Sequence, residues 1–193
     1  MSSKNIETYY PTSRADWRKW LVKNHETKQS VWLLFYNKKS EKVSISWSDA
    51  VNEALCFGWI DSKKQTIDEF CYRQYYSKRK PNSTWSKINK EKIEQLVKNG
   101  LMSKSGLKSI EIAKQNGFWT ILDEVEQLIV PKDLKEVLTS YNNAFEYFDS
   151  QSKSSKKMLL YWVASAKRPK TRQKRIEEIS KLASNGQKPK QFR

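Results

Sequence analysis

The sequence ALCFGWID, residues 54–61, marks the point at which a helical pattern gives way to a strand pattern. Upstream, Ser46 is followed three residues later by Asp49, the spacing of a capping box that opens a helix. Apolar residues then recur at helical spacing, namely Trp47, Ala50, Val51, Ala54 and Leu55. Gly58 stands where a left-handed residue commonly ends a helix. The stretch therefore predicts a helix that stops at Gly58 and turns into a strand.

Residues 59–67 and 70–77 are predicted to form the two strands of a hairpin, with Asp68 and Glu69 as its turn. A two-residue turn places Asp61 opposite Tyr76 and Ile67 opposite Phe70. Side chains alternate along a strand, so one face of the hairpin carries Trp59, Asp61, Phe70, Tyr72 and Tyr76. The other face then carries Cys71, Arg73 and Tyr75.

The rest of the chain predicts one more strand and several helices. Ser13 caps a helix that carries Trp17, Trp20 and Leu21, and residues 30–37 form the clearest strand. The helices expected downstream cover residues 86–99, 103–116, 131–141, 143–148, 154–166 and 170–184. We predict an α+β fold: a small antiparallel sheet with packed helices, followed by an all-helical C-terminal half. Residues 1–120 would form the α+β domain with the hairpin, and residues 121–193 a helical region packed on it within one continuous structural unit.

The chain carries a formal net charge of +16 over 193 residues. Such an excess attracts nucleic acid, anionic membranes or acidic partners, or else keeps a soluble surface solvated. The N-terminus has no apolar signal region, and no apolar run reaches the roughly 18–20 residues that cross a bilayer. With only Cys56 and Cys71 present, we expect a cytoplasmic protein with reduced, buried thiols.

Several segments resemble one protein family. They are residues 53–62 (EALCFGWIDS), 83–89 (STWSKIN), 100–107 (GLMSKSGL) and 166–176 (AKRPKTRQKRI). In this order they are similar to the YdeI or OmpD-associated family, also called bacteriocin-protection proteins. The chain departs from the family at Lys78-Arg79, at Leu101 and at Lys170. The resemblance implies a role in tolerating bacteriocins or antimicrobial peptides, and it implies no established enzymatic activity.

Several chemistries are disfavoured by the residues themselves. Zinc sites need three or four ligands at recognisable spacing, whereas the chain has one histidine, His25, and two distant cysteines. Cys56 falls in the last turn of a predicted helix, where the helix dipole disfavours a thiolate. No glycine-rich phosphate loop is present. We therefore expect no metal, no cofactor and no catalytic residue.

Asp61 is the acid with the greatest functional interest, because it follows the apolar residues 57–60 and would be partly buried. It is predicted either to form a structural ion pair or to anchor a ligand. The candidate ligand site consists of Trp59, Asp61, Arg73, Tyr76, Arg79 and Trp85. Trp85 also has a structural interpretation, as the hydrophobic staple before a helix capped by Ser86 or Ser83.

A second candidate is a basic surface in residues 150–175, which hold nine Lys or Arg and no acid. Helical spacing places Arg168, Arg172 and Arg175 on one face, with Lys167 beside them. This face would bind phosphate, acidic peptide or lipid headgroups, or would be solvated and paired with Glu177 and Glu178.

Together these patterns favour a non-enzymatic binding protein of the YdeI/OmpD-associated type, linked to bacteriocin or envelope-stress tolerance. Its partner would be an unknown anionic or polar ligand. One alternative is a nucleic-acid-binding or regulatory module that uses the basic surfaces, although no recognised nucleic-acid-binding motif accompanies them. Another alternative is a small-molecule enzyme that uses Asp61.

Overall fold

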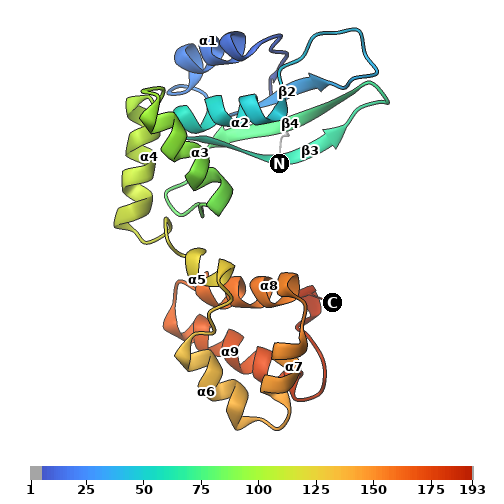
Figure 1. Ribbon diagram of the computed structural model, residues 1–193, viewed down its shortest axis with the longest axis vertical. Helices are drawn as coiled ribbons and strands as arrows, with labels where there is room; N and C mark the ends of the chain where they lie inside the picture. Colours follow the sequence, from blue (N-terminus) through green and yellow to red (C-terminus); the bar gives the residue numbers. More distant parts are fainter. Residues whose placement is uncertain (1–5, 193) are drawn as a thin grey trace. The chain divides into compact units, whose positions relative to one another are not determined.

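The computed structural model describes residues 6–192, in which the chain forms two compact units, one ending at Trp119 and the other beginning at Thr120 (Figure 1). Each unit has its own hydrophobic core. The N-terminal unit combines a four-stranded sheet with helices, and the described part of the C-terminal unit is helical. The predicted α+β class is confirmed.

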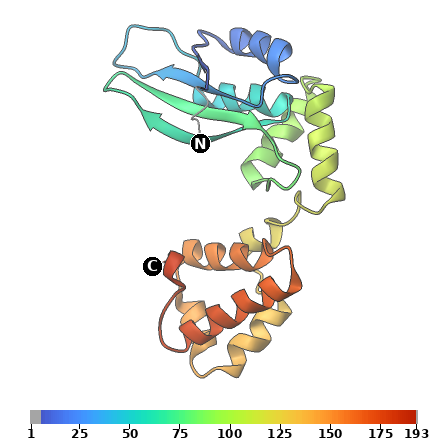
Figure 2. The ribbon, with the colours of Figure 1, turned by 180° about the vertical axis from the view of Figure 1, so that it is seen from behind.

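The sheet of the N-terminal unit has the strand order β1-β2-β4-β3 (Figures 1 and 2). Its strands are β1 (Thr8–Tyr9), β2 (Ser30–Tyr36), β3 (Trp59–Thr66) and β4 (Cys71–Lys78). β3 pairs antiparallel with β4, as the predicted hairpin requires, and β2 pairs antiparallel with the other edge of β4, a strand order that the sequence did not predict. The short strand β1 pairs parallel with β2 and was not predicted, because two residues are too few to show an alternating pattern.

The hairpin of β3 and β4 has a different turn from the one that the sequence predicts. Asp61 does lie opposite Tyr76. Farther along, however, Thr66 pairs with Tyr72, one residue out of the expected register, and the shift is absorbed by a bulge between Asp61 and Lys64. The turn is longer than two residues, with the main-chain nitrogen of Ile67 donating to Cys71 O at 3.2 Å. Asp68 and Glu69 do not suit a two-residue turn, which explains the longer loop.

Four helices of the N-terminal unit begin at serine caps. They are α1 (Arg14–Asn24), α2 (Trp47–Cys56), α3 (Lys87–Lys98) and α4 (Lys104–Gln115). The capping hydroxyls of Ser13, Ser46, Ser86 and Ser103 each accept a hydrogen bond from the main-chain nitrogen three residues later. This pattern satisfies a donor that helix formation leaves free, and it is why the starts of these helices are readable from the sequence.

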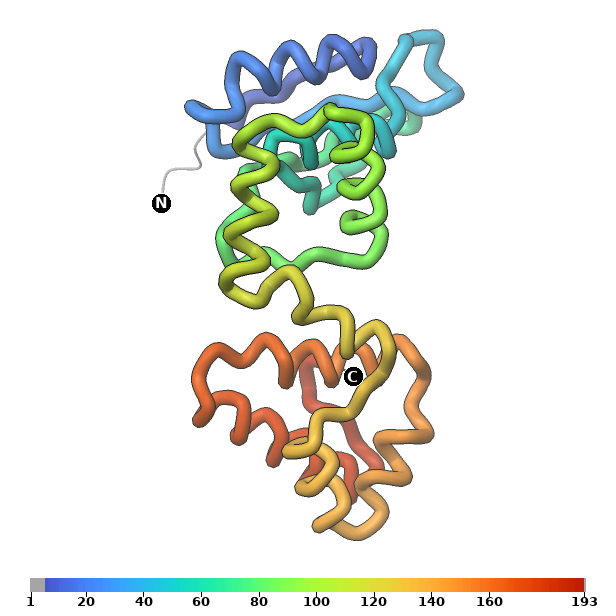
Figure 3. Tube along the Cα trace, turned by 60° about the vertical axis from the view of Figure 1, so that its left-hand side comes forward, coloured from blue at the N-terminus to red at the C-terminus, as the bar shows by residue number. Residues whose placement is uncertain are grey.

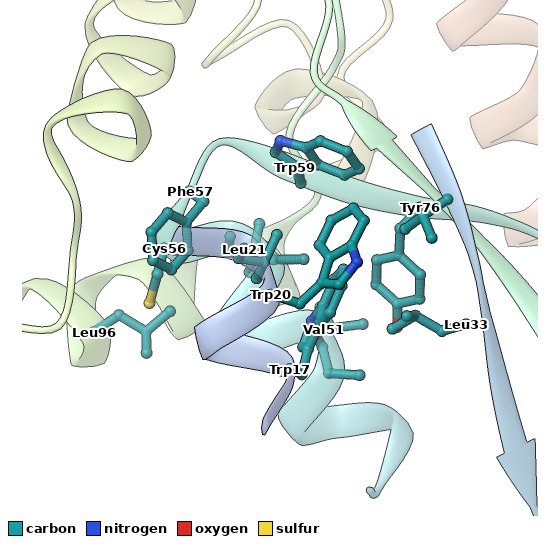
Figure 4. Close-up of a cluster of buried hydrophobic side chains, with 14 of the residues drawn as sticks. Trp17, Trp20, Leu21, Leu33, Val51, Cys56, Phe57, Trp59, Tyr76 and Leu96 are labelled. Carbon is teal, nitrogen blue, oxygen red and sulfur yellow. The ribbon is translucent and has the colours of Figure 1, made fainter. Parts of the chain in front are cut away.

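Helices α1 and α2 cover one face of the sheet with a core rich in aromatic residues (Figure 4). Trp17 stacks on Trp20 with 5.0 Å between ring centroids, and Trp20 meets Trp59 edge to face at 5.8 Å. Trp47 does not join this core, contrary to prediction, because 48% of it is exposed. It is the first residue of α2.

The end of α2 is held by close contact with α4. Gly58 has a φ of +71°, as its predicted role as a helix stop requires. Both the main-chain nitrogen and the hydroxyl of Ser103 donate to Cys56 O, at 2.9 and 2.8 Å. Gly106 lies so near that a Cβ added to it would stand 2.2 Å from Cys56 O. The absence of a side chain at Gly106 is therefore what lets the two helices meet.

The C-terminal unit is a small helical bundle (Figure 3). Its elements are α5 (Asp123–Glu126), α6 (Lys132–Ser140), α7 (Ala144–Ser150), α8 (Lys153–Ala164), α9 (Pro169–Ala183) and a 3-10 turn, η1 (Lys190–Phe192). Helix α9 contacts α6, α7 and α8 and buries Ile176 and Ile179 among them. The turn at η1 is tied to this core by Phe192, which packs on Trp162.

Candidate functional site

Asp61 lies on β3 and is held by two side chains from neighbouring elements. Its Oδ2 accepts a hydrogen bond from Trp47 Nε1 at 3.0 Å and another from Gln74 Nε2 at 3.1 Å. Trp47 begins α2 and Gln74 belongs to β4, so the carboxylate joins the helix to the hairpin. Two neutral donors on one oxygen stabilise the ionised carboxylate without neutralising its charge.

Tyr76 lies opposite Asp61 in the hairpin and is completely buried, with 0% of its surface exposed. Its hydroxyl has no hydrogen-bond partner within residues 6–192. Burial, together with the nearby charge of Asp61, raises the pKa of Tyr76 far above its ordinary value. The hydroxyl therefore keeps its proton at neutral pH and can act as a hydrogen-bond donor.

Arg79 follows β4, and only one of its guanidinium nitrogens finds a partner. Its main-chain nitrogen donates to Gly58 O at 2.9 Å, and Nη1 donates to Thr84 O at 3.0 Å. The central carbon of the guanidinium lies 3.5 Å from the centroid of the Trp85 ring. Nε and Nη2 are buried and have no partner among the described residues. Burial lowers the pKa of Arg79 to about 10, and the charge of Asp61 opposes that shift.

Trp85 combines the two interpretations that its sequence position suggests. It precedes the Ser86 cap of α3 and is 1% exposed, as expected of a residue that staples a helix start. The same ring also carries Arg79 and packs against Trp119, with 5.1 Å between ring centroids. One side chain therefore both packs at the start of α3 and supports the guanidinium of Arg79.

Three side chains of this site were not predicted, namely Trp47, Gln74 and Lys92. Lys92 Nζ donates to Ser48 Oγ and Asn52 Oδ1, both at 2.9 Å. Burial lowers the pKa of Lys92, and the charges of Asp49 and Asp61 oppose the effect. Gln74 alternates with Tyr76 along β4 and could have been found from that spacing. Lys92 could not have been found from the sequence, because no spacing pattern within its own helix indicates that it lies near Asp61.

We call the group formed by Trp47, Asp61, Gln74, Tyr76, Arg79, Trp85 and Lys92 the Asp61 cluster. Asp61 links its members, since its charge acts on Tyr76, Arg79 and Lys92.

The two other candidates in this region lie elsewhere. Trp59 is a core residue with 0% exposure, and its Nε1 donates to His25 O at 3.4 Å. Arg73 points away from the cluster: its Nε donates to Gln65 Oε1 at 2.9 Å and its guanidinium lies over Trp32. The structure therefore does not bring Arg73 together with Asp61 and Tyr76, because residues of odd and even number on β4 face opposite sides of the sheet.

The predicted basic surface of the C-terminal unit is largely committed to internal bonds. Arg172 Nε and Nη2 donate to Asp133 Oδ2 and Oδ1 at 2.6 and 2.9 Å, which ties α9 to α6. Arg175 Nη1 donates to Trp162 O at 2.5 Å and to Ser165 Oγ at 3.2 Å, which ties α9 to the end of α8. Lys167 and Arg168 are exposed. The three arginines predicted to form one binding face are therefore not all available to a ligand, since Arg172 and Arg175 hold helices together.

The sequence analysis also did not predict a network of buried charges centred on Glu53. Glu53 of α2 is 1% exposed, and its two carboxylate oxygens accept hydrogen bonds from Arg14 Nε at 2.5 Å and Arg18 Nη1 at 2.7 Å. Arg18 Nη2 also donates to Leu101 O at 2.8 Å. This network joins α1 to α2 and leaves Glu53 fully paired, so it serves structure.

The cysteines and the histidine occupy structural positions. Cys56 and Cys71 are free thiols, and burial is the main cause that raises the pKa of each. His25 ends α1, with Nδ1 2.8 Å from Leu21 O and Nε2 3.1 Å from Ser105 Oγ. Residues 6–192 contain no group of three or more His, Cys, Asp or Glu placed to hold a metal ion. None of the helices in that range is long and apolar enough to cross a membrane.

Comparison with known proteins places the two units in two family descriptions. No curated protein and no solved structure matches the chain. Residues 127–186, which include Asp133, Arg172 and Arg175, match the family described as "Bacteriocin-protection, YdeI or OmpD-Associated" and confirm the predicted resemblance in this part. Residues 9–109, which include the Asp61 cluster and more than half of the chain, match "Domain of unknown function (DUF8412)". The chain therefore belongs to the DUF8412 family over its N-terminal unit and is of the YdeI/OmpD-associated type over its C-terminal unit.

Proposed function

We propose that this chain is a non-enzymatic binding protein that holds a small polar or anionic ligand at the Asp61 cluster, in a role connected with bacteriocin or envelope-stress tolerance. One observation carries the proposal: the Tyr76 hydroxyl and two nitrogens of Arg79 are each buried without a partner among the described residues, and the charge of Asp61 acts on both side chains. Buried polar groups in native proteins are nearly always paired, and an unpaired group costs about 1–3 kcal/mol. Three such donors in one cluster are best explained by a ligand that completes their pairing.

The chemistry of the cluster favours binding over catalysis. Acid–base catalysis commonly uses two titrating groups whose pKa values are set apart around neutrality. Here the pKa of Tyr76 is raised far above neutrality, and that of Arg79, although lowered, stays near 10. Asp61 Oδ2 is occupied by two neutral donors. Tyr76 therefore keeps its proton and Arg79 its charge at neutral pH, which suits recognition of a ligand.

The link to bacteriocin or envelope-stress tolerance rests on the family description that the C-terminal unit matches. Tolerance would follow if the bound ligand, or its capture, alters how the cell responds to a cationic peptide. Both binding and tolerance can be tested with the same variants.

The test compares wild type with Arg79→Met, which removes the two unpartnered nitrogens, and with Arg73→Met, a matched change on the opposite face of the sheet. Each purified protein is incubated with a small-molecule extract of its expression host, washed, denatured and analysed by mass spectrometry. Cells that express each variant are then exposed to a cationic antimicrobial peptide. We expect wild type and Arg73→Met to retain a compound and to protect the cells, and Arg79→Met to lose both. Equal retention and equal survival for all three proteins would refute the proposal.

A further inference from the structure

We infer that the Asp61 cluster binds its ligand through a carboxylate group, held by the Nε–H and Nη2–H of Arg79 and by the hydroxyl of Tyr76. This inference rests on the proposed function and narrows it to one class of ligand.

The two unpartnered nitrogens of Arg79 form one recognition edge. A guanidinium is planar and carries five N–H donors in a fixed geometry, of which Nε–H and one Nη2–H are parallel. Nη1 already donates to Thr84 O at 3.0 Å. The donors left over are therefore the adjacent pair that can bind both oxygens of one carboxylate at once.

Arg172 in the C-terminal unit shows the same arrangement with the edge filled. Its Nη1 donates to a main-chain oxygen, Val163 O, at 3.3 Å. Its Nε and Nη2 bind the two oxygens of Asp133 at 2.6 and 2.9 Å. Arg79 likewise gives Nη1 to a main-chain oxygen, but no carboxylate of the described residues occupies its Nε and Nη2. The comparison indicates that a carboxylate is what completes the contacts of Arg79.

The edge of Arg79 is also held in place before any ligand arrives. The guanidinium lies flat enough on the Trp85 ring to bring its central carbon within 3.5 Å of the ring centroid, and Trp85 is 1% exposed. The main chain of Arg79 is fixed by its bond to Gly58 O at 2.9 Å. A preorganised donor pair loses little conformational entropy on binding, which raises the affinity that each hydrogen bond provides.

The charges around Arg79 favour a singly charged ligand over a phosphate dianion. Asp61 lies close enough for its negative charge to act on both Arg79 and Tyr76. Lys92 is engaged by Ser48 and Asn52 and by the charges of Asp49 and Asp61. One guanidinium beside one carboxylate leaves little net positive charge, so Asp61 repels a dianion more strongly than a singly charged ligand.

The inference is tested on the full chain by titrating it with sodium acetate, sodium phosphate at pH 7 or sodium chloride at matched ionic strength. The readout is the Nε–H signal of Arg79 in a ¹⁵N-labelled sample, assigned by its loss in Arg79→Lys. We expect acetate to move this signal in a saturable way, phosphate to act more weakly, and chloride to leave it in place. A missing response to acetate, an equal response to chloride, or tighter binding of phosphate would each overturn the carboxylate assignment.

Calorimetric titration of variants with acetate completes the test. Arg79→Lys keeps the charge but loses the paired donors, and we expect at least about tenfold weaker binding. Tyr76→Phe removes one donor without changing the packing, and it should also weaken binding even if Arg79→Lys fails to fold. Arg73→Lys, a matched change on the opposite face of the sheet, should bind acetate as wild type does. Unchanged affinity in Tyr76→Phe would exclude the hydroxyl from the site.

The two proposals fail in different ways. If Arg79→Met loses the compound retained from the host extract while acetate leaves the Arg79 signal unmoved, the cluster binds a ligand that is not a carboxylate. If no compound is retained by any variant, the proposed function itself fails.

Discussion

The guanidinium of Arg79 lies over the indole of Trp85, with 3.5 Å between its central carbon and the ring centroid. This contact satisfies the flat face of the guanidinium but not its edge, where Nε and Nη2 remain without partners among the described residues. A cation that packs on an aromatic ring in the interior gains attraction from the ring while it still lacks hydrogen-bond acceptors. The N-terminal unit thus keeps a buried cation under-satisfied, and this has measurable consequences for stability.

We expect Tyr76→Phe to stabilise the ligand-free protein by about 1 kcal/mol, because it removes a buried hydroxyl that has no partner. Tyr9→Phe serves as the contrast, since Tyr9 Oη donates to Asp16 Oδ1 at 2.7 Å and its loss should destabilise the fold. The free energy of unfolding of both variants can be measured by urea denaturation. A loss of stability in Tyr76→Phe as large as that in Tyr9→Phe would mean that the Tyr76 hydroxyl is paired in solution.

The Asp133–Arg172 pair should stabilise the C-terminal unit in a manner that depends on pH. The bidentate bond to Arg172 lowers the pKa of Asp133 below its ordinary value of 3.8. A carboxyl whose pKa is lowered on folding contributes stability above its unfolded pKa and loses it as the pH falls through the folded pKa. The pair therefore contributes at neutral pH, and its contribution should fade as the solution is acidified below about 3.8.

Asp133→Asn tests this pair. Because side-chain exposures are 30% for Arg172 and 44% for Asp133, solvent screens the interaction, and we expect a loss of only about 1 kcal/mol at pH 7. Hydrogen exchange of the α6 and α9 amides would locate the effect. Glu136→Gln, which alters the exposed pair of Lys132 and Glu136 in the same helix, should leave exchange unchanged. A difference between Asp133→Asn and wild type that persists below the folded pKa would contradict the assignment.

The cysteine thiols should react slowly with a thiol reagent in the native protein. Burial raises the pKa of Cys56 and of Cys71, with the charges of Glu53 and Asp68 adding to the effect. The thiolate is the reactive form, so the rate at pH 8 should be far below that of the unfolded chain. Because the pKa of each thiol is raised above the ordinary value of 9.0, the rate in the native protein should still increase at pH values where that of the unfolded chain levels off. The reaction rate can be measured by disulfide exchange with Ellman's reagent at several pH values, with and without urea. A fast native reaction at pH 8 would show an accessible, activated thiol.

The sequence pattern predicted local structure well and side-chain partnerships poorly. Serine caps and the left-handed Gly58 are local signals, and the structure confirms them at α1, α2, α3 and α4. The Asp61–Tyr76 pairing was also predictable, because the bulge in β3 compensates for the longer turn. The pattern did not give the partners of Trp47, Arg73 and Arg172, which belong to other elements. Periodicity assigns a residue to a face of its own helix or strand but does not reveal what a distant element brings to that face.

Gly106 provides a sharp test of the contact between α2 and α4. A Cβ there would meet Cys56 O at 2.2 Å and Cys56 C at 2.8 Å, so Gly106→Ala must push the two helices apart. Separation would strain or break the two hydrogen bonds from Ser103 to Cys56 O. We expect Gly106→Ala to lower the free energy of unfolding by about 3 kcal/mol or more.

Gly100→Ala is the matched control for Gly106→Ala. Gly100 has a φ of +64° but no neighbour within 4 Å of an added Cβ, so only the backbone penalty of about 1–2 kcal/mol applies. Urea denaturation of both variants separates the two contributions. Because α2 also carries Trp47, displacement of this helix should disturb the hydrogen bond from Trp47 Nε1 to Asp61 as well. Gly106→Ala should therefore weaken acetate binding at the Asp61 cluster, whereas Gly100→Ala should bind acetate as wild type does. Equal stability losses in the two variants would show that α2 and α4 are not in close contact at Gly106.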